Sequence, residues 1–251
     1  MTDPLFELLC RMGDNALVLG HRMSEWCGVA PVLEEDIALA NTALDLIGQA
    51  RMWLDLAGET EGKGRNADRL AFHRDVWDFR NLLLVEQPNG DFGQTMMRQF
   101  LFDAWHELYL AALTQSPNEA IAGIAGKAQK EVRYHLTRSS EIVISLGDGT
   151  AESHARMQKA ADRLYPFVGE MIDDDQIDTA LQQAGLVPRS AGLKEAFHER
   201  LDNVFREATL ARPQESYSQK GGKTGKRHSE HLGHLLTQMQ WLPRAYPDAT
   251  W

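Results

Sequence analysis

Apolar residues recur along this chain at intervals close to the 3.6 residues of an α-helical turn. Residues 4–26 show this spacing after an early proline, of the kind that a first helical turn tolerates, and Gly28 follows the segment. Residues 33–57 predict a second long helix that Gly58 and the polar residues after it bring to an end. The apolar stripe expected to face the core on this second helix consists of Ile37, Ala40, Leu44, Ile47 and Leu54.

Two further long helices are predicted in residues 91–115 and 116–146, after an irregular or shortly helical stretch at 68–91. Ser116 and Pro117 are expected to be the N-cap and first helical residue of the last of these. Beyond Gly147–Gly149, shorter helices are expected in residues 151–172, with a kink at Pro166, and in 175–184, 190–210 and 229–242.

No segment alternates as a strand pair would, so the expected fold class is all-α: a four-helix bundle with additional C-terminal helices. We expect residues 1–251 to form a single helical domain, with the core bundle at about 4–146 and C-terminal helices and a tail ending in Trp251 at about 150–251.

Composition narrows the class of protein. The chain has 251 residues and a formal net charge of −10, which disfavours nucleic acid or an anionic membrane as the main partner. No apolar run approaches the ~20 residues that span a bilayer. Two cysteines, Cys10 and Cys27, suit a reducing compartment, and both are expected to pack as small apolar side chains. These features predict a cytoplasmic protein.

An all-α bundle invites a test for a di-iron centre, which takes a Glu from each of two helices and Glu-x-x-His from each of the other two. The four long helices offer acidic candidates at Asp14, Asp45, Asp103 and Glu131. Their intervals of 31, 58 and 28 residues suit similar heights on successive helices.

The histidines do not follow the pattern. The position three residues after Asp45 is Gly48, and three after Glu131 is Tyr134. His135 comes one position late, which turns it about 100° around the helix. His106 follows Asp103 by three residues, on a helix expected to supply only a carboxylate. We therefore expect a degenerate site without metal, in which these acids and histidines form a buried hydrogen-bonded cluster.

Two clusters of donors could bind anions. Residues 220–228 precede a helix N-terminus and are expected to form a basic interaction loop, or merely a solvated one; its members are Lys220, Lys223, Lys226, Arg227 and His228. Arg74, Arg80 and Asn81 are interleaved with Trp77 and Phe79, a pattern that could hold a phosphate and an adenine. Packing between helices would produce the same pattern and is the favoured interpretation.

Longer motifs show a family resemblance that covers nearly the whole chain. They are GDN at 13–15, EWCG at 25–28, DLIGQAR at 45–51, NLLLVEQPNG at 81–90, DAWH at 103–106, KEVRYHL at 130–136, GGKTGKRH at 221–228, EHLG at 230–233 and MQ at 239–240. In these motifs the chain resembles the C subunits of bacterial phenylacetyl-CoA 1,2-epoxidases. The block ending in Gln-Pro-Asn-Gly is far more specific than a short catalytic motif.

The resemblance implies a non-catalytic ferritin-like subunit of a multicomponent monooxygenase, which pairs with the catalytic A subunit of the epoxidase and stabilises it. The di-iron centre would lie in that catalytic partner, flavin and iron–sulfur groups would lie in a reductase, and no cofactor would be bound by this chain. The complex would epoxidise the ring of phenylacetyl-CoA in aerobic phenylacetate breakdown. The resemblance also implies that the chain contributes to the substrate site, through Asp78, Phe79, Arg80, Asn81, Thr179, Ala180 and Leu181.

Within that site, the charge of Arg80 suits a CoA phosphate. Two other functions stay open at this point: a di-iron oxygenase active in its own right, and a stand-alone module that binds CoA thioesters. An isolated chain could also form a homodimer.

Overall fold

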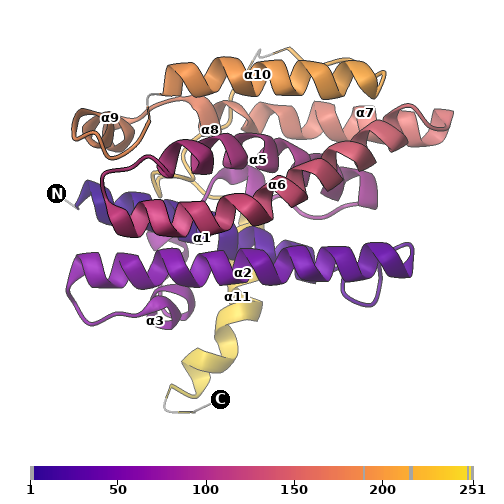
Figure 1. The fold of residues 1–251 in the computed structure, drawn as a ribbon. Helices are drawn as coiled ribbons and strands as arrows, with labels where there is room; N and C mark the ends of the chain where they lie inside the picture. Colours follow the sequence, from indigo (N-terminus) through magenta and orange to yellow (C-terminus); the bar gives the residue numbers. More distant parts are fainter. Residues whose placement is uncertain (1–2, 189, 215–216, 248, 250–251) are drawn as a thin grey trace. The chain divides into compact units, whose positions relative to one another are not determined.

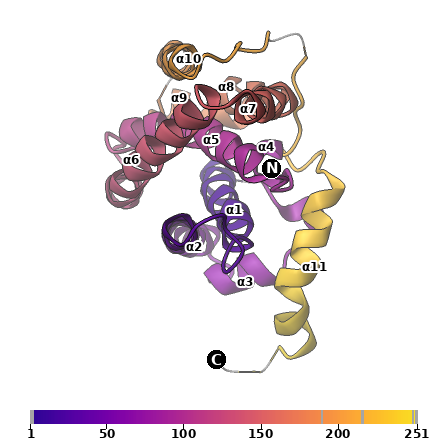
Figure 2. The same cartoon turned by 90° about the vertical axis from the view of Figure 1, so that its right-hand side faces the viewer.

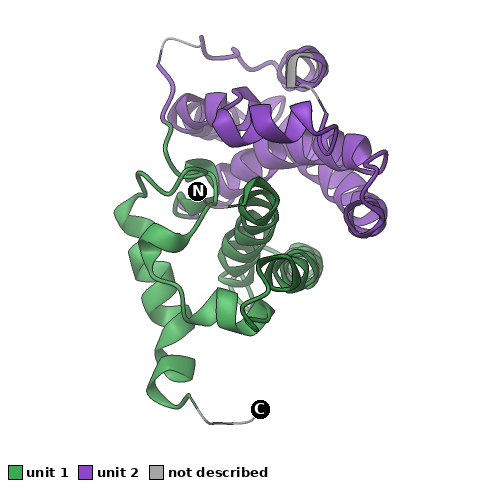
Figure 3. Ribbon diagram, turned by 90° about the vertical axis from the view of Figure 1, so that its left-hand side faces the viewer, with its two compact units in different colours: residues 1–88, 220–251 green, residues 89–219 purple. Residues whose placement is uncertain are grey.

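The computed structural model describes residues 3–188, 190–214, 217–247 and 249, and Trp251 lies outside them. The described residues form helices and no strands, which confirms the all-α prediction. The chain divides into two compact units, residues 1–88 with 220–251 and residues 89–219 (Figure 3). This division does not follow the expected boundary near residue 146, because the C-terminal segment returns to the first unit. That the whole chain is a single domain stays a prediction.

The first unit is built on two long helices, α1 (Pro4–Ser24) and α2 (Leu33–Glu61), which lie side by side (Figure 1). The Asp3 side chain caps α1 by accepting a hydrogen bond from the Leu5 N–H, and Pro4 occupies its first turn. Gly13 and Gly20 allow close packing, because a Cβ on either would meet side chains of α2. The other two long helices of the chain lie in the second unit.

The face of α2 that packs inward differs from the predicted one. Leu39, Leu46 and Trp53 are almost fully buried, whereas Ile37, Leu44 and Ile47 of the predicted stripe are exposed. Of that stripe, Leu54 is buried and Ala40 is half-buried. The helix has apolar residues on two faces, and the prediction chose the wrong one.

The C-terminal end of α2 also differs from its prediction. The helix passes through Gly58 and ends three residues later, where Gly62 adopts φ 67° and its N–H bonds to the Gly58 carbonyl. A Cβ at Gly58 would lie 1.8 Å from the Arg65 carbonyl oxygen, so glycine is needed there for close approach of the following loop rather than to break the helix.

Replacing Gly58 with alanine is therefore expected to lower the free energy of unfolding by about 1–3 kcal/mol, since the loop backbone must move away. The control lies in the same helix. At Gly48 a Cβ would meet nothing within 4 Å, so Gly48→Ala is expected to raise the free energy by up to about 1 kcal/mol through helix propensity. Urea unfolding of both variants checks the pair; equal effects would show that the Arg65 contact is unimportant.

Short helices and the C-terminal helix complete the first unit. They are α3 (Ala67–Phe72), the 3₁₀ turn η1 (Val76–Asp78), α4 (Leu83–Glu86) and α11 (Glu230–Ala245). Helix α11 packs along α3 and η1 (Figure 2). The buried Gln240 amide fixes it there by donating to the Ala71 and Arg74 carbonyl oxygens at 2.9 and 3.0 Å.

The second unit is centred on α5 (Phe92–Leu113), which is buried on nearly every face and packs against α6 (Glu119–Gly147), α7 (Ala151–Leu164) and α10 (Ser190–Glu207). The predicted start of α6 is wrong. Asn118 is the N-cap and accepts from the Ala120 and Ile121 N–H groups, while the Ser116 hydroxyl donates to the Leu186 carbonyl oxygen. That tertiary hydrogen bond keeps Ser116 outside the helix.

The stretch predicted as one kinked helix after residue 151 is broken. Helix α7 ends at Leu164, a 3₁₀ turn η2 (Tyr165–Phe167) contains Pro166, and α8 (Gly169–Ile172) follows. Helix α9 (Gln176–Gln183) then begins behind an Asp175 cap. None of the helices in the described ranges has the length and apolar character needed to cross a membrane.

Candidate functional site

The first acidic candidate, Asp14, lies fully buried on α1 in an ion pair. Both of its carboxylate oxygens accept hydrogen bonds from the guanidinium of Arg74, which is 5% exposed. The backbone N–H of Arg80 donates to the same carboxylate at 2.8 Å. Burial lowers the pKa of Arg74, but Asp14 outweighs it and raises that pKa above its ordinary value, so the guanidinium is charged. The oxygens of Asp14 are thus already bonded to nitrogen donors.

Arg74 also connects this pair to its surroundings. Its Nε donates to the Leu70 carbonyl oxygen at 2.5 Å and its Nη1 to the Asp78 carbonyl oxygen at 3.1 Å. The guanidinium lies 4.5 Å from the centre of the Phe79 ring. Cys10 lies in the same region, and burial raises the pKa of its thiol to about 12, so it is neither a thiolate nucleophile nor a ready metal ligand. Cys27 is exposed, so the expectation that it packs inside is wrong.

The family resemblance implied that residues 78–81 contact substrate. In the structure this segment is packed into the first unit. Phe79 and Asn81 are fully buried, whereas Asp78 is exposed. Arg80 donates from Nε to the Glu7 carboxylate at 2.7 Å and from Nη1 to the Trp77 and Phe79 carbonyl oxygens. This geometry supports the packing interpretation of the arginine and aromatic cluster over a phosphate-binding one.

The basic loop is anchored by one of its own residues. The His228 side chain is 1% exposed, and its two ring nitrogens face the Glu86 carboxylate at 2.5 Å and the Phe79 carbonyl oxygen at 3.2 Å. A carbonyl oxygen can only accept, so the Nε2 of His228 donates to Phe79, while Nδ1 faces the Glu86 carboxyl group. The fully buried Glu86 also accepts from Ser229 N–H and Asn81 Nδ2.

The rest of the loop runs over the residue 79–83 segment. A Cβ at Gly222 would lie 2.4 Å from the Asn81 carbonyl oxygen. Gly225 adopts φ 66° in the turn, and its N–H bonds to the Gly222 carbonyl. Lys220, Lys226 and Arg227 are exposed, while Lys223 is half-buried. Of the predicted interaction residues, His228 therefore points inward, and Lys220, Lys226 and Arg227 present positive charge to the outside.

A second buried polar cluster lies between α5 and α6 in the other unit. Asp103 is fully buried and accepts from the Gln99 amide at 2.8 Å and the Ser139 hydroxyl at 2.9 Å. His106 and His135 are each 2% exposed. Burial lowers the pKa of His106 to about 3, so its ring is neutral, and its Nδ1 has no hydrogen-bond partner among the described residues. Asp103, His106 and His135 thus share the buried interior that was expected for a hydrogen-bonded cluster.

This cluster predicts a specific pH dependence. Burial raises the pKa of Asp103 from 3.8 to about 7, although His135 opposes the shift. Between these two values the folded protein holds a proton that the unfolded chain has lost, so stability decreases as pH rises through that window. Relative to Asp103→Asn, the natural protein is expected to lose up to about 1.4 kcal/mol of unfolding free energy per pH unit between pH 5 and 7. Urea unfolding at several pH values measures the difference, and a flat difference would contradict the buried-acid interpretation.

The remaining positions of the di-iron pattern lie outside these buried clusters. Gly48 and Tyr134 are exposed, and Asp45 and Glu131 are half-buried. Within either unit, the described residues include no group of three His, Cys, Asp or Glu side chains that could hold a metal ion. With Asp14 bonded to Arg74 and glycine and tyrosine at the two His positions, the residues present do not fit a di-iron centre.

The other implied substrate residues lie on α9. Thr179 and Ala180 border a depression of about 420 Å³ that Asp174 and Asp175 also line, while Leu181 is buried at 2% exposure. The Asp175 carboxylate accepts from the Ile177 and Asp178 N–H groups and so caps α9. The depression offers carboxylates rather than cations, which is a poor complement to an anionic CoA phosphate.

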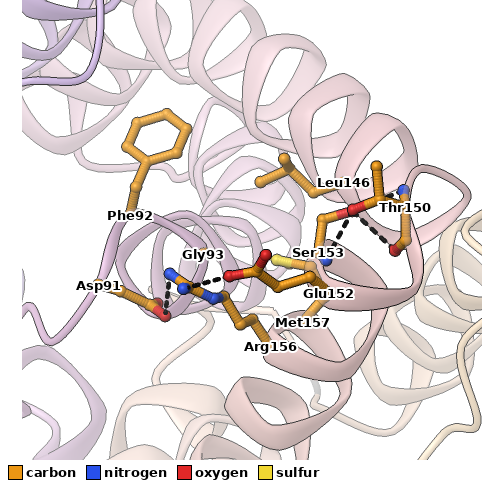
Figure 4. Close-up of a pocket in the computed structure, with 9 residues that line it drawn as sticks. All are labelled: Asp91, Phe92, Gly93, Leu146, Thr150, Glu152, Ser153, Arg156 and Met157. Atoms are coloured by element: carbon orange, nitrogen blue, oxygen red, sulfur yellow. Dashed lines mark hydrogen bonds and ion pairs between the residues drawn. The ribbon is translucent and has the colours of Figure 1, made fainter.

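A further cavity, of about 290 Å³, lies where the start of α5 meets α7 (Figure 4). Arg156 crosses it and pairs with Glu152 and, at 3.9 Å, with Asp91. Thr150 and Ser153 form a capping box at its edge. The polar side chains of this cavity bond to one another, so the arrangement stabilises helix ends and offers no evident chemistry.

Sequence reasoning missed the two ion pairs that organise the first unit. Asp14 and Arg74 were both noticed, one as a metal-site candidate and one as a phosphate donor, but not as partners 60 residues apart. Glu86 was not singled out, although it lies within the most specific motif of the chain. The only signal for Glu86 in the sequence was an acidic residue inside a motif that ends in Gln-Pro-Asn-Gly.

Comparison with known proteins agrees with the motifs. The family described as "Phenylacetic acid catabolic protein" matches residues 1–251. The chain is also 47% identical, over 241 residues, to the Escherichia coli protein named as the C subunit of 1,2-phenylacetyl-CoA epoxidase, and the match covers 96% of each chain. The resemblance inferred from the motifs is thereby confirmed. The chain belongs to the phenylacetic acid catabolic protein family and is similar to an epoxidase C subunit.

Proposed function

We propose that this chain is a non-catalytic structural subunit of a cytoplasmic phenylacetyl-CoA 1,2-epoxidase, where it pairs with and stabilises the di-iron catalytic subunit. The similarity to an E. coli epoxidase C subunit supports a place in such a complex. The observation that carries the non-catalytic part is the Asp14–Arg74 ion pair, which occupies the first carboxylate of the expected ligand pattern with an arginine.

The side chains of this chain support a non-catalytic role beside a catalytic subunit that holds the iron. An iron pair needs carboxylate and imidazole ligands converging from four helices, and this chain has glycine and tyrosine where two of the histidines belong. In the proposed complex the di-iron centre belongs to the catalytic subunit, and flavin and iron–sulfur groups belong to the reductase. This chain's own residues supply packing surface and a rigid support for the partner's helices.

A contribution to substrate binding would come from exposed cations. Arg80 is engaged with Glu7 inside the first unit, so it is not the group we propose for a CoA phosphate. Lys226 and Arg227, exposed on the basic loop, are better placed to meet an anionic ligand of the complex.

Co-expression with the cognate catalytic subunit tests the proposal. We expect the two proteins to purify together at high salt, because an apolar interface is insensitive to screening. We expect about two irons per catalytic chain and none attributable to this chain after anaerobic loading of each protein alone. Separation of the two proteins at micromolar concentration, or two irons bound by this chain, would contradict the proposal.

A further inference from the structure

Helix α2 carries a second apolar stripe on its outer face, which meets the face that packs on α1 at Ile47, beside Gly20. Leu33 is 71% exposed, Leu44 is 67% exposed and Ile37 is 53% exposed. Together with Ala40 and Ile47 they recur at intervals of four, three, four and three residues. This 3.5-residue repeat is the pattern of helices that pack side by side along a seam. Such a continuous apolar stripe marks an interaction surface, whereas scattered exposed apolar residues do not.

The stripe is long enough to receive a helix. From Leu33 to Ile47 it covers 15 residues, which span about 21 Å at the rise of an α-helix. Val29 and Val32, 67% and 53% exposed, extend it into the preceding loop. In the part of the chain that the structure describes, these side chains stay exposed, while the opposite face of the helix supplies the core.

The charges beside the stripe restrict what can cover it. The acidic side chains that flank the stripe on α2 are Glu34, Asp36 and Asp45, of which Asp36 also accepts from the Gly28 and Ala30 N–H groups. Arg51 is the only basic residue of α2, and it already pairs with Asp55 at 3.8 Å. A second copy of this chain would bring acidic borders against acidic borders, which is unfavourable. The occupant that fits has an apolar seam bordered by lysine or arginine.

We infer that the outer face of α2, from Leu33 to Ile47, is the docking surface for a helix of the catalytic subunit, whose apolar seam is bordered by basic residues. The inference rests on the proposed function, which supplies the partner. Leu44 lies well inside the stripe and would insert between side chains of the partner helix, with the two helices crossing at about 20°.

The test measures binding of the full chain to the purified cognate catalytic subunit. Leu44→Glu places a carboxylate in the seam and is expected to weaken binding by about 100-fold, because that charge would be buried without a partner. Ile37→Glu is expected to act in the same way. Both side chains are exposed in this chain, so thermal unfolding of the variants alone should match the natural protein.

The matched control is Tyr217→Glu, which adds the same charge at a side chain 64% exposed outside the stripe and is expected to leave binding unchanged. If both stripe variants bound the catalytic subunit as tightly as the natural chain does, the inference would be overturned and the proposed function would stand. Failure of the natural chain to bind at all would overturn both. If Leu44→Glu instead dissociated a homodimer of this chain and left binding to the catalytic subunit unchanged, a second copy would be what covers the stripe. The inference would then be wrong.

The acidic residues that border the stripe can be tested separately through the rate of association. Glu34→Lys is expected to slow association with the catalytic subunit when the salt concentration is low, with the difference fading as salt rises. An equal or faster association rate would overturn the basic character assigned to the partner's seam.

Discussion

Replacing Arg74 with methionine is expected to lower the free energy of unfolding by roughly 3–5 kcal/mol, because it leaves the Asp14 carboxylate buried without its counter-charge. The carbonyl oxygens of Leu70 and Asp78 lose their donor in the same step. Methionine keeps much of the arginine volume, so the effect reports on charge and hydrogen bonding rather than on a cavity.

Urea unfolding measures this effect, with Arg69→Met as the control. Arg69 is an exposed arginine on α3, the short helix that ends just before Arg74, and its replacement is expected to change the free energy by less than about 0.5 kcal/mol. Combining Arg74→Met with Asp14→Asn should recover part of the loss, since the unpaired charge is then removed. Equal effects of Arg69→Met and Arg74→Met would refute the role given to the ion pair.

Replacing His228 with alanine is expected to free the C-terminal segment from the first unit. The His228 ring is the buried partner of the fully buried Glu86, and removing one partner of a buried pair costs about 3 kcal/mol or more. Because helix α11 follows directly, the loss should appear as local opening of residues 220–245 rather than as global unfolding.

Hydrogen exchange of the α11 amides measures this opening. A loss of about 3 kcal/mol corresponds to roughly 100-fold faster exchange through local opening. Glu86→Gln should act in the same direction, whereas His234→Ala, at an exposed position of α11, should leave exchange unchanged. Unaltered exchange in His228→Ala would show that the Glu86 contact does not hold the segment in place.

Periodicity located the long helices because their apolar residues repeat over five or more turns. It could not choose between two apolar faces of α2, since one faces the core and the other is exposed, and both follow helical spacing. The start of α6 was misplaced for a different reason. Ser116 has the right chemistry for a cap, but its hydroxyl is used by Leu186, 70 residues away. A local pattern does not reveal such a tertiary bond.

The buried polar residues of the candidate site could be predicted from the sequence, but their hydrogen-bond and ion-pair partners could not. Spacing along the helices singled out Asp14, Asp103, His106 and His135, all of which are buried. Which donors meet them depends on contacts between distant segments, as with Asp14 and Arg74. The 142-residue separation of Glu86 and His228 hides their contact in the same way. From the sequence alone, His228 was therefore expected to belong to an exposed basic loop.

The central claim is that this chain stabilises a catalytic partner without performing the chemistry itself. The most direct measurement is the melting temperature of the iron-loaded catalytic subunit during titration with this chain. We predict a rise that saturates with concentration and is reduced by Leu44→Glu, because binding to the folded state stabilises it by mass action. A melting temperature that does not change at any concentration of this chain would contradict the account.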